Sequence, residues 1–397
     1  STAPAIINFS GTSEFKNNTA LSQGGAIRND GTITFGENST ATFTKNTADW
    51  GGAISNNENG TITFNGGAEF TSNKATGNYS DGGAISNNGT IKFGSTATFK
   101  ENTASDTGGA IDNSGTITFG NTATFTENTT SYDGGAIYNN YGDGTITFNG
   151  GADFTSNKAT YGAGGAIHNY GTITFGNTAT FTSNEAHYGG AIYNGGTIEF
   201  ANTATFKENT ASDGGAISNE GTMEFGSTAT FEGNTASDGG AIRNYDGGTI
   251  TFNGGAEFTS NTASSSGGAI RNYDGGTVEF ANTATFISNK ASSDGAIYNE
   301  GTMEFGSTAT FTDNKATGDY SYGGAILNSY DSDIDFIGIA RFEGNTASNY
   351  GGAIYNKGTI EFGSTATFTS NKATNGIGGA IYNSGTVTFS GGAEFTQ

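Results

Sequence analysis

The sequence contains no cysteine and only one proline, Pro4, among 397 residues. Without cysteine the chain has no disulfide, no thiol nucleophile and no cysteine-based metal site. A collagen triple helix is excluded as well, because it needs glycine at every third position together with abundant proline. Basic residues are scarce: 15 lysines and arginines face 37 aspartates and glutamates, a net charge of −22. This imbalance argues against binding to nucleic acid, which favours a basic surface.

Long apolar runs and helical periods are missing too. No run approaches the roughly 20 apolar residues that a membrane-spanning helix requires, so we expect no membrane span. The 67 glycines do not make the chain a flexible linker, because 30 phenylalanines and 17 tyrosines recur at fixed positions. Aromatic side chains in such number must be buried in a core or take part in binding. The sequence opens on STAPAIINF without methionine, which predicts either a processed, secreted chain or a trimmed one.

What the sequence does contain is a repeat. The pattern GG-A-I-x-N begins at Gly24 and recurs through Gly378, with a degenerate copy, DGAI, at Asp294. Each repeat of about 27 residues carries three short pieces, typified by GGAIRN, GTITF and ATFTKN. Apolar and polar residues alternate in the second and third pieces, as they do in half-buried strands. The sequence therefore predicts an all-β, single-domain parallel β-helix of about 14 coils with three short strands per coil.

This solenoid is expected to run continuously over residues 1–397, with partial coils at 1–23 and 384–397. Its core is expected to consist of columns of identical residues, such as Ile27 stacked on Ile54, and Phe35 stacked on Phe64. Inward asparagines, beginning with Asn29 and Asn46, are expected to bond from coil to coil, because an amide both donates and accepts. Asparagine also tolerates the left-handed geometry of a corner, and the glycine pair is expected to supply positive φ at another.

The residue after the isoleucine of GGAI varies from copy to copy and is predicted to point outward. His168 occupies this slot in its copy and is predicted to be a surface residue. Ala26, which stands two positions before the slot in the first copy, is also predicted to point outward. Tyrosine and arginine recur in the slot, and both are enriched where proteins bind partners, although tyrosine also suits an exposed strand. The slot is therefore a candidate binding face for a protein, a glycan or a second copy of the chain. The candidate residues are Tyr138, Tyr193, Tyr298, Tyr355, Tyr382, Arg28, Arg243 and Arg271.

A second tetrapeptide, FxxN, alternates with GGAI along nearly the whole chain, for example at Phe15, Phe43 and Phe368. With both tetrapeptides the sequence resembles the passenger repeats of the chlamydial polymorphic outer membrane proteins. The resemblance implies a secreted, right-handed β-helix displayed on the cell surface by an autotransporter and used in adhesion. We therefore expect a non-enzymatic, extracellular structural or adhesive element that requires no cofactor.

Two other functions remain open. The ends of the chain match the second and third pieces of a coil and show no cap, so end-to-end stacking into an extracellular filament is the first alternative. The residues expected at such ends are Ile6, Ile7, Phe9, Val387, Phe389 and Phe395. The second alternative is ice binding through paired threonines such as Thr32 and Thr34, although charged residues replace one of the pair in half of the copies.

One coil departs from the repeat, with SYDSDIDFIGIA at 329–340 in place of the usual GTIEF piece. Asp331, Asp333 and Asp335 alternate there, so all three carboxylates are expected on one face. They would suit Ca²⁺, which prefers oxygen ligands, or an acidic catalytic patch. The third interpretation is a drifted coil in which outward threonine and glutamate became aspartate.

Overall fold

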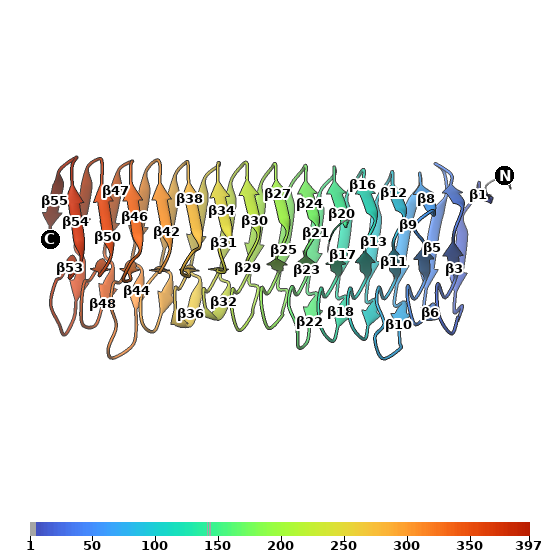
Figure 1. Ribbon diagram of the computed structural model, residues 1–397, viewed down its shortest axis with the longest axis horizontal. Helices are drawn as coiled ribbons and strands as arrows, with labels where there is room; N and C mark the ends of the chain where they lie inside the picture. The colour runs from blue at the N-terminus through green and yellow to red at the C-terminus, as the bar shows by residue number, and fades with distance from the viewer. Residues whose placement is uncertain (1–4, 141, 143) are drawn as a thin grey trace. The chain divides into compact units, whose positions relative to one another are not determined.

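The computed structural model describes residues 5–140, 142 and 144–397, and the regular structure in that part of the chain is β-strand, without a helix. The chain divides into two compact units at Asn202 and Thr203. Each unit is a parallel β-solenoid in which every coil pairs in register with the next. Figure 1 shows the same order of strands recurring from coil to coil within each unit. The predicted all-β parallel β-helix is confirmed.

Four kinds of strand build a coil. We name their sheets by the sequence that forms them: the GGAI sheet, the GTITF sheet, the ATF sheet, and an outer sheet of short strands that follows each FxxN corner. The outer strands correct the expected number of strands per coil, because most described coils carry a fourth strand beyond the three predicted. Two-residue strands such as Thr47–Ala48 are too short to show a period in the sequence.

In the first unit, the GGAI sheet contains β3 (Ile27–Asn29), β7 (Ile54–Asn56), β11 (Ile85–Asn87), β15 (Ile111–Asn113), β19 (Ile137–Asn139), β23 (Ile167–Asn169) and β26 (Ile192–Asn194). The GTITF sheet contains β1 (Ile6–Phe9), β4 (Thr32–Phe35), β8 (Thr61–Phe64), β12 (Thr90–Phe93), β16 (Thr116–Phe119), β20 (Thr145–Phe148), β24 (Thr172–Phe175) and β27 (Thr197–Phe200). The ATF sheet contains β2 (Ser13–Lys16), β5 (Thr40–Thr44), β9 (Gly67–Thr71), β13 (Ala97–Lys100), β17 (Ala123–Thr126), β21 (Ala152–Thr155) and β25 (Ala179–Thr182). The outer sheet contains β6 (Thr47–Ala48), β10 (Lys74–Ala75), β14 (Thr103–Ala104), β18 (Thr129–Thr130) and β22 (Lys158–Ala159).

In the second unit, the GGAI sheet contains β29 (Ile217–Asn219), β33 (Ile242–Asn244), β37 (Ile270–Asn272), β41 (Ile297–Asn299), β45 (Ile326–Asn328), β49 (Ile354–Asn356) and β53 (Ile381–Asn383). The GTITF sheet contains β30 (Thr222–Phe225), β34 (Thr249–Phe252), β38 (Thr277–Phe280), β42 (Thr302–Phe305), β46 (Asp333–Phe336), β50 (Thr359–Phe362) and β54 (Thr386–Phe389). The ATF sheet contains β28 (Ala204–Lys207), β31 (Ala229–Glu232), β35 (Ala256–Thr259), β39 (Ala284–Ile287), β43 (Ala309–Thr312), β47 (Ala340–Glu343), β51 (Ala366–Thr369) and β55 (Ala393–Thr396). The outer sheet contains β32 (Thr235–Asp238), β36 (Thr262–Ser266), β40 (Lys290–Ala291), β44 (Lys315–Ala316), β48 (Thr346–Ala347) and β52 (Lys372–Ala373).

The core of each unit is made of stacked identical side chains, as predicted. Phe35 pairs in register with Phe64, and their parallel rings lie 4.6 Å apart between centroids. Phe43 belongs to a second column and meets the Phe35 ring edge-on at 6.2 Å. Both the offset stack and the edge-on contact are favoured arrangements of aromatic rings. The alternation of GTITF is therefore explained by its inward Ile and Phe, which are buried in every strand of this sheet except β1 and β54.

Two asparagine ladders fasten the coils to one another. Nδ2 of Asn29 donates to Oδ1 of Asn56 at 2.8 Å, and this bond recurs from coil to coil at the end of the GGAI strands. In the FxxN ladder, both the backbone nitrogen and Nδ2 of Asn73 donate to Oδ1 of Asn102 at 3.0 Å. These buried amides are thus paired, which confirms the expected inward asparagines and removes the cost of burying them.

The corners depend on left-handed backbone. The first glycine of each pair has positive φ, 59° at Gly24 and 60° at Gly51, as predicted for this corner. At the FxxN corner, however, the left-handed residue is the one before the asparagine, such as Lys45 with φ of 55°. The expectation that the asparagine itself adopts this geometry is wrong, because its side chain is committed to the ladder.

Replacing Asn102 with alanine is expected to destabilise the protein by about 3 kcal/mol, since it removes the acceptor of two Asn73 donors and leaves them buried. Chemical denaturation measures this loss. The exposed Asn59 serves as the control, and its replacement with alanine is expected to change stability by less than about 0.5 kcal/mol. Equal effects at the two positions would contradict a stabilising role for the ladder.

Candidate functional site

The slot side chains lie on the outer face of the GGAI sheet, but much of this column is covered. Ser55, Asp112 and His168 are only 4%, 8% and 3% exposed. The prediction that His168 is a surface residue is therefore wrong, and Ala53, in the place of the outward Ala26, is fully buried. At His168 the cover comes from side chains of the adjoining coils, Asp133, Tyr138 and Tyr193.

The eight candidate slot residues divide by exposure. Arg28 is exposed and pairs with Asp30 on the same corner. Tyr193 and Tyr355 are buried, at 8% and 9% exposure. The others are half-buried: Tyr138, Arg243, Arg271, Tyr298 and Tyr382. The expectation of a fully outward column is therefore wrong at Tyr193 and Tyr355, whereas partner binding through the slot stays a prediction.

A pairing rule connects successive coils under the outer layer. A carboxylate that directly precedes the glycine pair of one coil approaches the slot side chain of the next coil. Asp133 Oδ1 lies 3.3 Å from His168 Nδ1, and Asp238 Oδ1 lies 3.0 Å from Arg271 Nη1. Asp213 reaches Arg243 at 3.9 Å in the same way. The two arginine pairs are ionic, and the imidazole of His168 meets its carboxylate at the same position.

His168 is enclosed by aromatic rings in addition to its carboxylate partner. The rings of Tyr138, Tyr170 and Tyr193 lie 5.1, 4.7 and 4.5 Å from the imidazole centroid. Burial alone would raise the pKa of Asp133, but His168 and the backbone N–H of Ala163 outweigh it and hold the pKa below its usual value. The cluster is compact, mostly buried and structural in character.

The second unit carries a stack of alternating tyrosine and arginine. The Arg243 guanidinium lies 3.8 Å from the ring centroid of Tyr245 and 4.9 Å from that of Tyr273. Arg271 continues the stack, 4.3 Å from Tyr273 and 4.5 Å from Tyr298. Cation–π contacts of this kind fix the planes of both partners. The stack therefore gives this part of the surface a defined shape.

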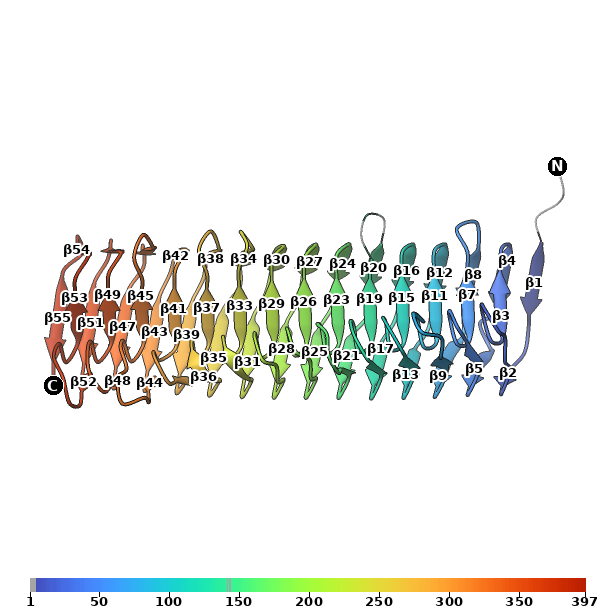
Figure 2. The same cartoon turned by 60° about the horizontal axis from the view of Figure 1, so that its bottom comes forward.

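A groove of about 500 Å³ lies beside this stack. Its walls come from the corners between the GGAI and GTITF sheets, which differ in length. The corners at 245–248 and 329–332 hold four residues, whereas the corner after Asn299 holds two, so the short corner lies between longer ones. Figure 2 shows such long corners projecting beyond the short ones, for example between β7 and β8. Corner length, varied on a constant scaffold, thus creates the groove.

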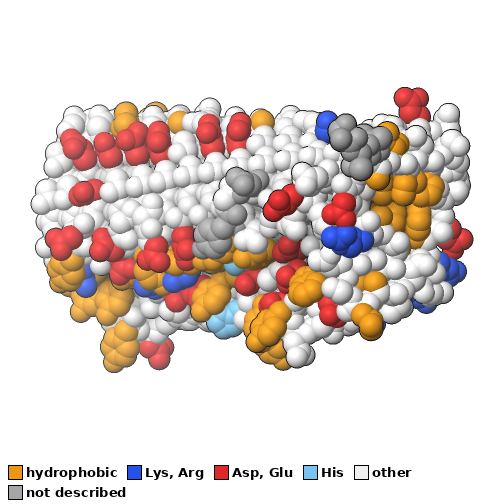
Figure 3. All heavy atoms as spheres, turned by 45° about the vertical axis from the view of Figure 1, so that its right-hand side comes forward, with side chains coloured by type: hydrophobic (Ala, Val, Ile, Leu, Met, Phe, Trp, Pro, Cys, Tyr) orange, Lys and Arg blue, Asp and Glu red, His pale blue; other side chains and the backbone are white. Residues whose placement is uncertain are grey.

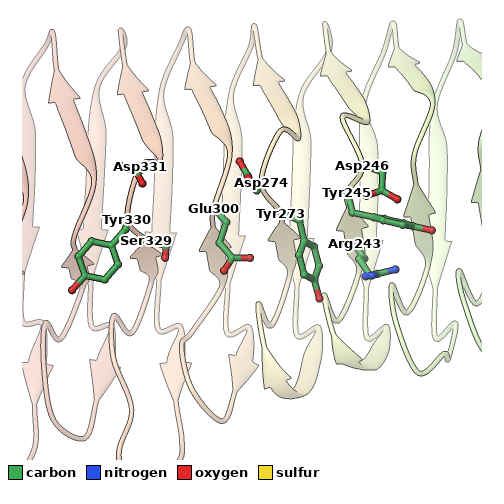
Figure 4. Close-up of a pocket in the computed structure, with 9 residues that line it drawn as sticks. All are labelled: Arg243, Tyr245, Asp246, Tyr273, Asp274, Glu300, Ser329, Tyr330 and Asp331. Carbon is green, nitrogen blue, oxygen red and sulfur yellow. The ribbon is translucent and has the colours of Figure 1, made fainter.

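The groove is lined by aromatic rings and carboxylates. Figure 4 shows Glu300 between the two walls, with Tyr273 and Arg243 on one side and Tyr330 on the other. Its complete lining is Arg243, Tyr245, Asp246, Tyr273, Asp274, Glu300, Ser329, Tyr330 and Asp331. Four carboxylates face one guanidinium there, so the groove carries excess negative charge.

Acidic residues also stack on the adjoining GTITF sheet. Glu279, Glu304 and Asp335 are register partners on successive strands, and Glu361 follows them. Figure 3 shows acidic side chains in rows on the face turned toward the reader. Like charges directly opposite each other on neighbouring strands are unfavourable. These acids also interrupt the threonine pairs of the ice-binding alternative, which stays a prediction.

The remaining predicted sites lie elsewhere. Asp333 and Asp335 point outward from β46, while Asp331 occupies the preceding corner with φ of 57°. Within the described ranges, no group of three or more histidine, aspartate or glutamate side chains is arranged to hold a metal ion. The expected end residues occupy β1, β54 and β55: Ile6, Ile7, Phe9, Val387, Phe389 and Phe395. End-to-end stacking through them stays a prediction, as does Ca²⁺ binding.

Sequence reasoning missed the tyrosines of the groove, Tyr245, Tyr273 and Tyr330, because they follow the slot and vary with corner length. The signal was present: NYDGG occurs twice where most copies have a two-residue corner.

The described residues hold no helix of the length and apolarity that a membrane crossing needs.

These features define a repeat-built parallel β-solenoid with a regular core and variable corners. Nine stretches of its sequence match the Chlamydia polymorphic membrane protein repeat, at residues 12–30, 32–57, 96–114, 122–140, 178–195, 203–220, 228–245, 255–273 and 340–357. The resemblance drawn from GGAI and FxxN is confirmed in these nine stretches, which are distributed between residues 12 and 357. No curated protein and no solved structure matches it.

Asp294 stands where the other copies of the motif have the first glycine, and it is fully buried. Its Oδ1 accepts the N–H of Gly267, whereas Oδ2 has no hydrogen-bond partner. Burial raises the pKa of Asp294 to about 7, with Gly267 and Arg271 opposing the shift and Asp238 and Glu300 adding to it. The folded state therefore binds this proton more tightly than the unfolded chain does.

This raised pKa predicts a stability loss as pH rises from about 4 to about 7, because the folded protein must then hold a buried charge. Replacing Asp294 with glycine is expected to stabilise the protein by about 2 kcal/mol more at pH 8 than at pH 5. Denaturant unfolding at the two pH values measures the difference. The exposed Asn59, changed to alanine, is the control and should show no such dependence because neither residue ionises. A gain independent of pH at position 294 would contradict the assignment.

Proposed function

We propose that the protein is a non-enzymatic, extracellular binding solenoid displayed on a cell surface, with an adhesive role. The observation that carries this proposal is the groove beside the Tyr–Arg stack of the second unit. The match to polymorphic membrane protein repeats supports surface association. The scaffold supports the binding role, because its interior columns are uniform while its corners vary in length and charge.

The lining of the groove indicates the chemistry of the partner. Asp246, Asp274 and Asp331 are exposed and form no ion pair in the described part of the chain. The one arginine of the lining, Arg243, is already held between two tyrosine rings and paired with Asp213. The net charge of −22 repels anionic partners at longer range. We infer that the groove takes a lysine- or arginine-bearing segment of a partner protein.

Dimensions support an extended segment. The groove reaches from the corner after β33 to the corner after β45, which is three coil steps. At about 4.8 Å per step the groove is about 14 Å long, the length of roughly four extended residues. Tyr330, which is 66% exposed, stands at one end of the groove with Nζ of Lys357 4.8 Å from its ring centroid, the kind of contact that a lysine or arginine of the partner would make with such a ring.

A decalysine peptide is the probe for this proposal, with an uncharged Gly-Ser peptide of equal length beside it. Changing Asp246, Asp274 and Asp331 together to asparagine is expected to weaken decalysine binding at least tenfold, as measured by fluorescence anisotropy. The affinity should also fall as salt rises, because the interaction is electrostatic.

A matched control separates the groove from the charge of the whole protein. Glu69, Glu257 and Glu394 are exposed acids outside the groove, and changing all three to glutamine removes the same charge. This control should alter affinity less than twofold. Equal losses in both triple variants, or no binding of decalysine, would overturn the assignment of the groove.

A further inference from the structure

Two carboxyl groups meet under the outer layer of the first unit. Asp81 precedes the glycine pair of one coil, and Asp112 occupies the slot of the next coil, on β15. The hydroxyl of Thr107 lies between them, 2.9 Å from Asp81 Oδ1 and 3.1 Å from Asp112 Oδ2. Asp112 is only 8% exposed. Both contacts are of hydrogen-bond length, so a hydrogen is required in each.

The number of hydrogens available decides the charge of the pair. A threonine hydroxyl has one hydrogen, whereas an ionised carboxylate only accepts. With both carboxylates ionised, Thr107 donates to one of them, and its other short contact brings two lone pairs together. With one proton on Asp112, that carboxyl donates to Thr107 Oγ1, which in turn donates to Asp81. One proton therefore completes a continuous chain of hydrogen bonds across the pair.

Comparison with other coils identifies this arrangement as an exception. Where Asp133, Asp213 and Asp238 precede the glycine pair, the next slot holds a histidine or an arginine. At Asp81 the next slot holds an acid instead. No lysine or arginine forms an ion pair with Asp81, Asp106 or Asp112 in the described residues. A proton shared by Asp81 and Asp112 can therefore take the place that a basic side chain occupies in the other coils.

We propose that Asp81 and Asp112 hold one proton between them through Thr107, and that this proton fastens residues 103–108 over the GGAI sheet. Around Thr107 the segment is attached through this group: the Thr107 hydroxyl contacts both acids, and its backbone N–H donates to Asp81 Oδ1 at 3.3 Å. Elsewhere the segment is held by the pairing of β14 with β10 and β18, by the Asp106 N–H to the Ser80 carbonyl at 3.1 Å, and by the Ser105 hydroxyl to the Gly77 carbonyl. Release of the proton places two negative charges on either side of one hydroxyl and loosens the segment.

The surrounding charges act in the same direction. Burial raises the pKa of Asp112 to about 7, and the charges of Asp81 and Asp106 add to the shift, while Thr107 opposes it. Burial raises the pKa of Asp81 and of Asp106 as well, with Asp133 adding to the latter. Asp133 is itself paired with His168. The attachment is therefore present at acidic pH and lost as pH rises through about 7.

Hydrogen exchange of the full chain at pH 5.5 and pH 8.5, corrected for the intrinsic exchange rate, tests the proposal. Protection of residues 103–108 is expected to fall at least tenfold at the higher pH. Asp112→Asn should abolish this dependence, because an amide nitrogen supplies the second hydrogen at every pH. Asp81→Asn keeps an acceptor oxygen for the N–H and hydroxyl of Thr107 and should leave a weaker dependence, because burial still raises the pKa of Asp112. The double variant should behave like Asp112→Asn.

Asp246→Asn, at an exposed corner, is the control and should retain the dependence seen in the unchanged protein. Protection that does not change with pH in the unchanged protein would overturn the proposal. It would equally be overturned by a pH dependence that persists in Asp112→Asn, or by effects that add in the double variant, since one shared proton cannot be lost twice.

Discussion

The structure depends on the exact stacking of each coil on the next, and the buried asparagine amides are the interaction that enforces it. An inward amide is satisfied only if another amide stands at the same place one coil away, as Asn56 does for Asn29. A shift of one residue would break the ladder and turn Phe35 away from Phe64. This requirement explains why the chain repeats a dozen residues with so little variation, since each coil must supply the same partners to two neighbours.

Function is then confined to positions that stacking leaves free. These are the slot on the outer face of the GGAI sheet and the corners that follow it. Variation in the slot decides which side chain approaches the residue before the glycine pair: an arginine at Arg271, an imidazole at His168 and a second carboxyl group at Asp112. Variation in corner length determines where the surface projects and where it is hollowed, and it creates the groove beside Tyr273. Neither kind of change disturbs the columns, so the surface can vary while the core is kept.

The repetitive part of the fold was predictable from sequence because every coil requires the same residue types at the same positions, so the sequence repeats at a fixed interval. The Phe columns, the asparagine ladders and the positive φ of Gly24 were all anticipated on this basis. The outer sheet was not, because a two-residue strand such as β6 has no detectable period. His168 was expected on the surface but is covered by Asp133, Tyr138 and Tyr193 of neighbouring coils, which a single repeat does not reveal. The residue with left-handed backbone at the FxxN corner was also predicted wrongly: it is Lys45 and not the asparagine that follows it.

The candidate site was only partly predictable for a related reason. Arg243 and Arg271 were singled out by residue type, and they do take part in the stack beside the groove. The groove itself arises from the difference between neighbouring corners, which a single repeat does not reveal. The pairing of Asp133 with His168 likewise joins residues of successive coils. Both features become visible only when each residue is compared with its neighbour one coil away.

The central claim, that coils are interchangeable as long as their register is kept, is tested most directly by removing one. Deletion of residues 85–110 joins Ala84 to Ile111 and removes a whole coil, whereas deletion of 85–109 leaves one extra residue. Thermal unfolding followed by circular dichroism compares the two proteins. The in-register deletion is predicted to unfold cooperatively at a temperature close to that of the intact protein, and the other to be markedly destabilised. Equal destabilisation of both would contradict the account.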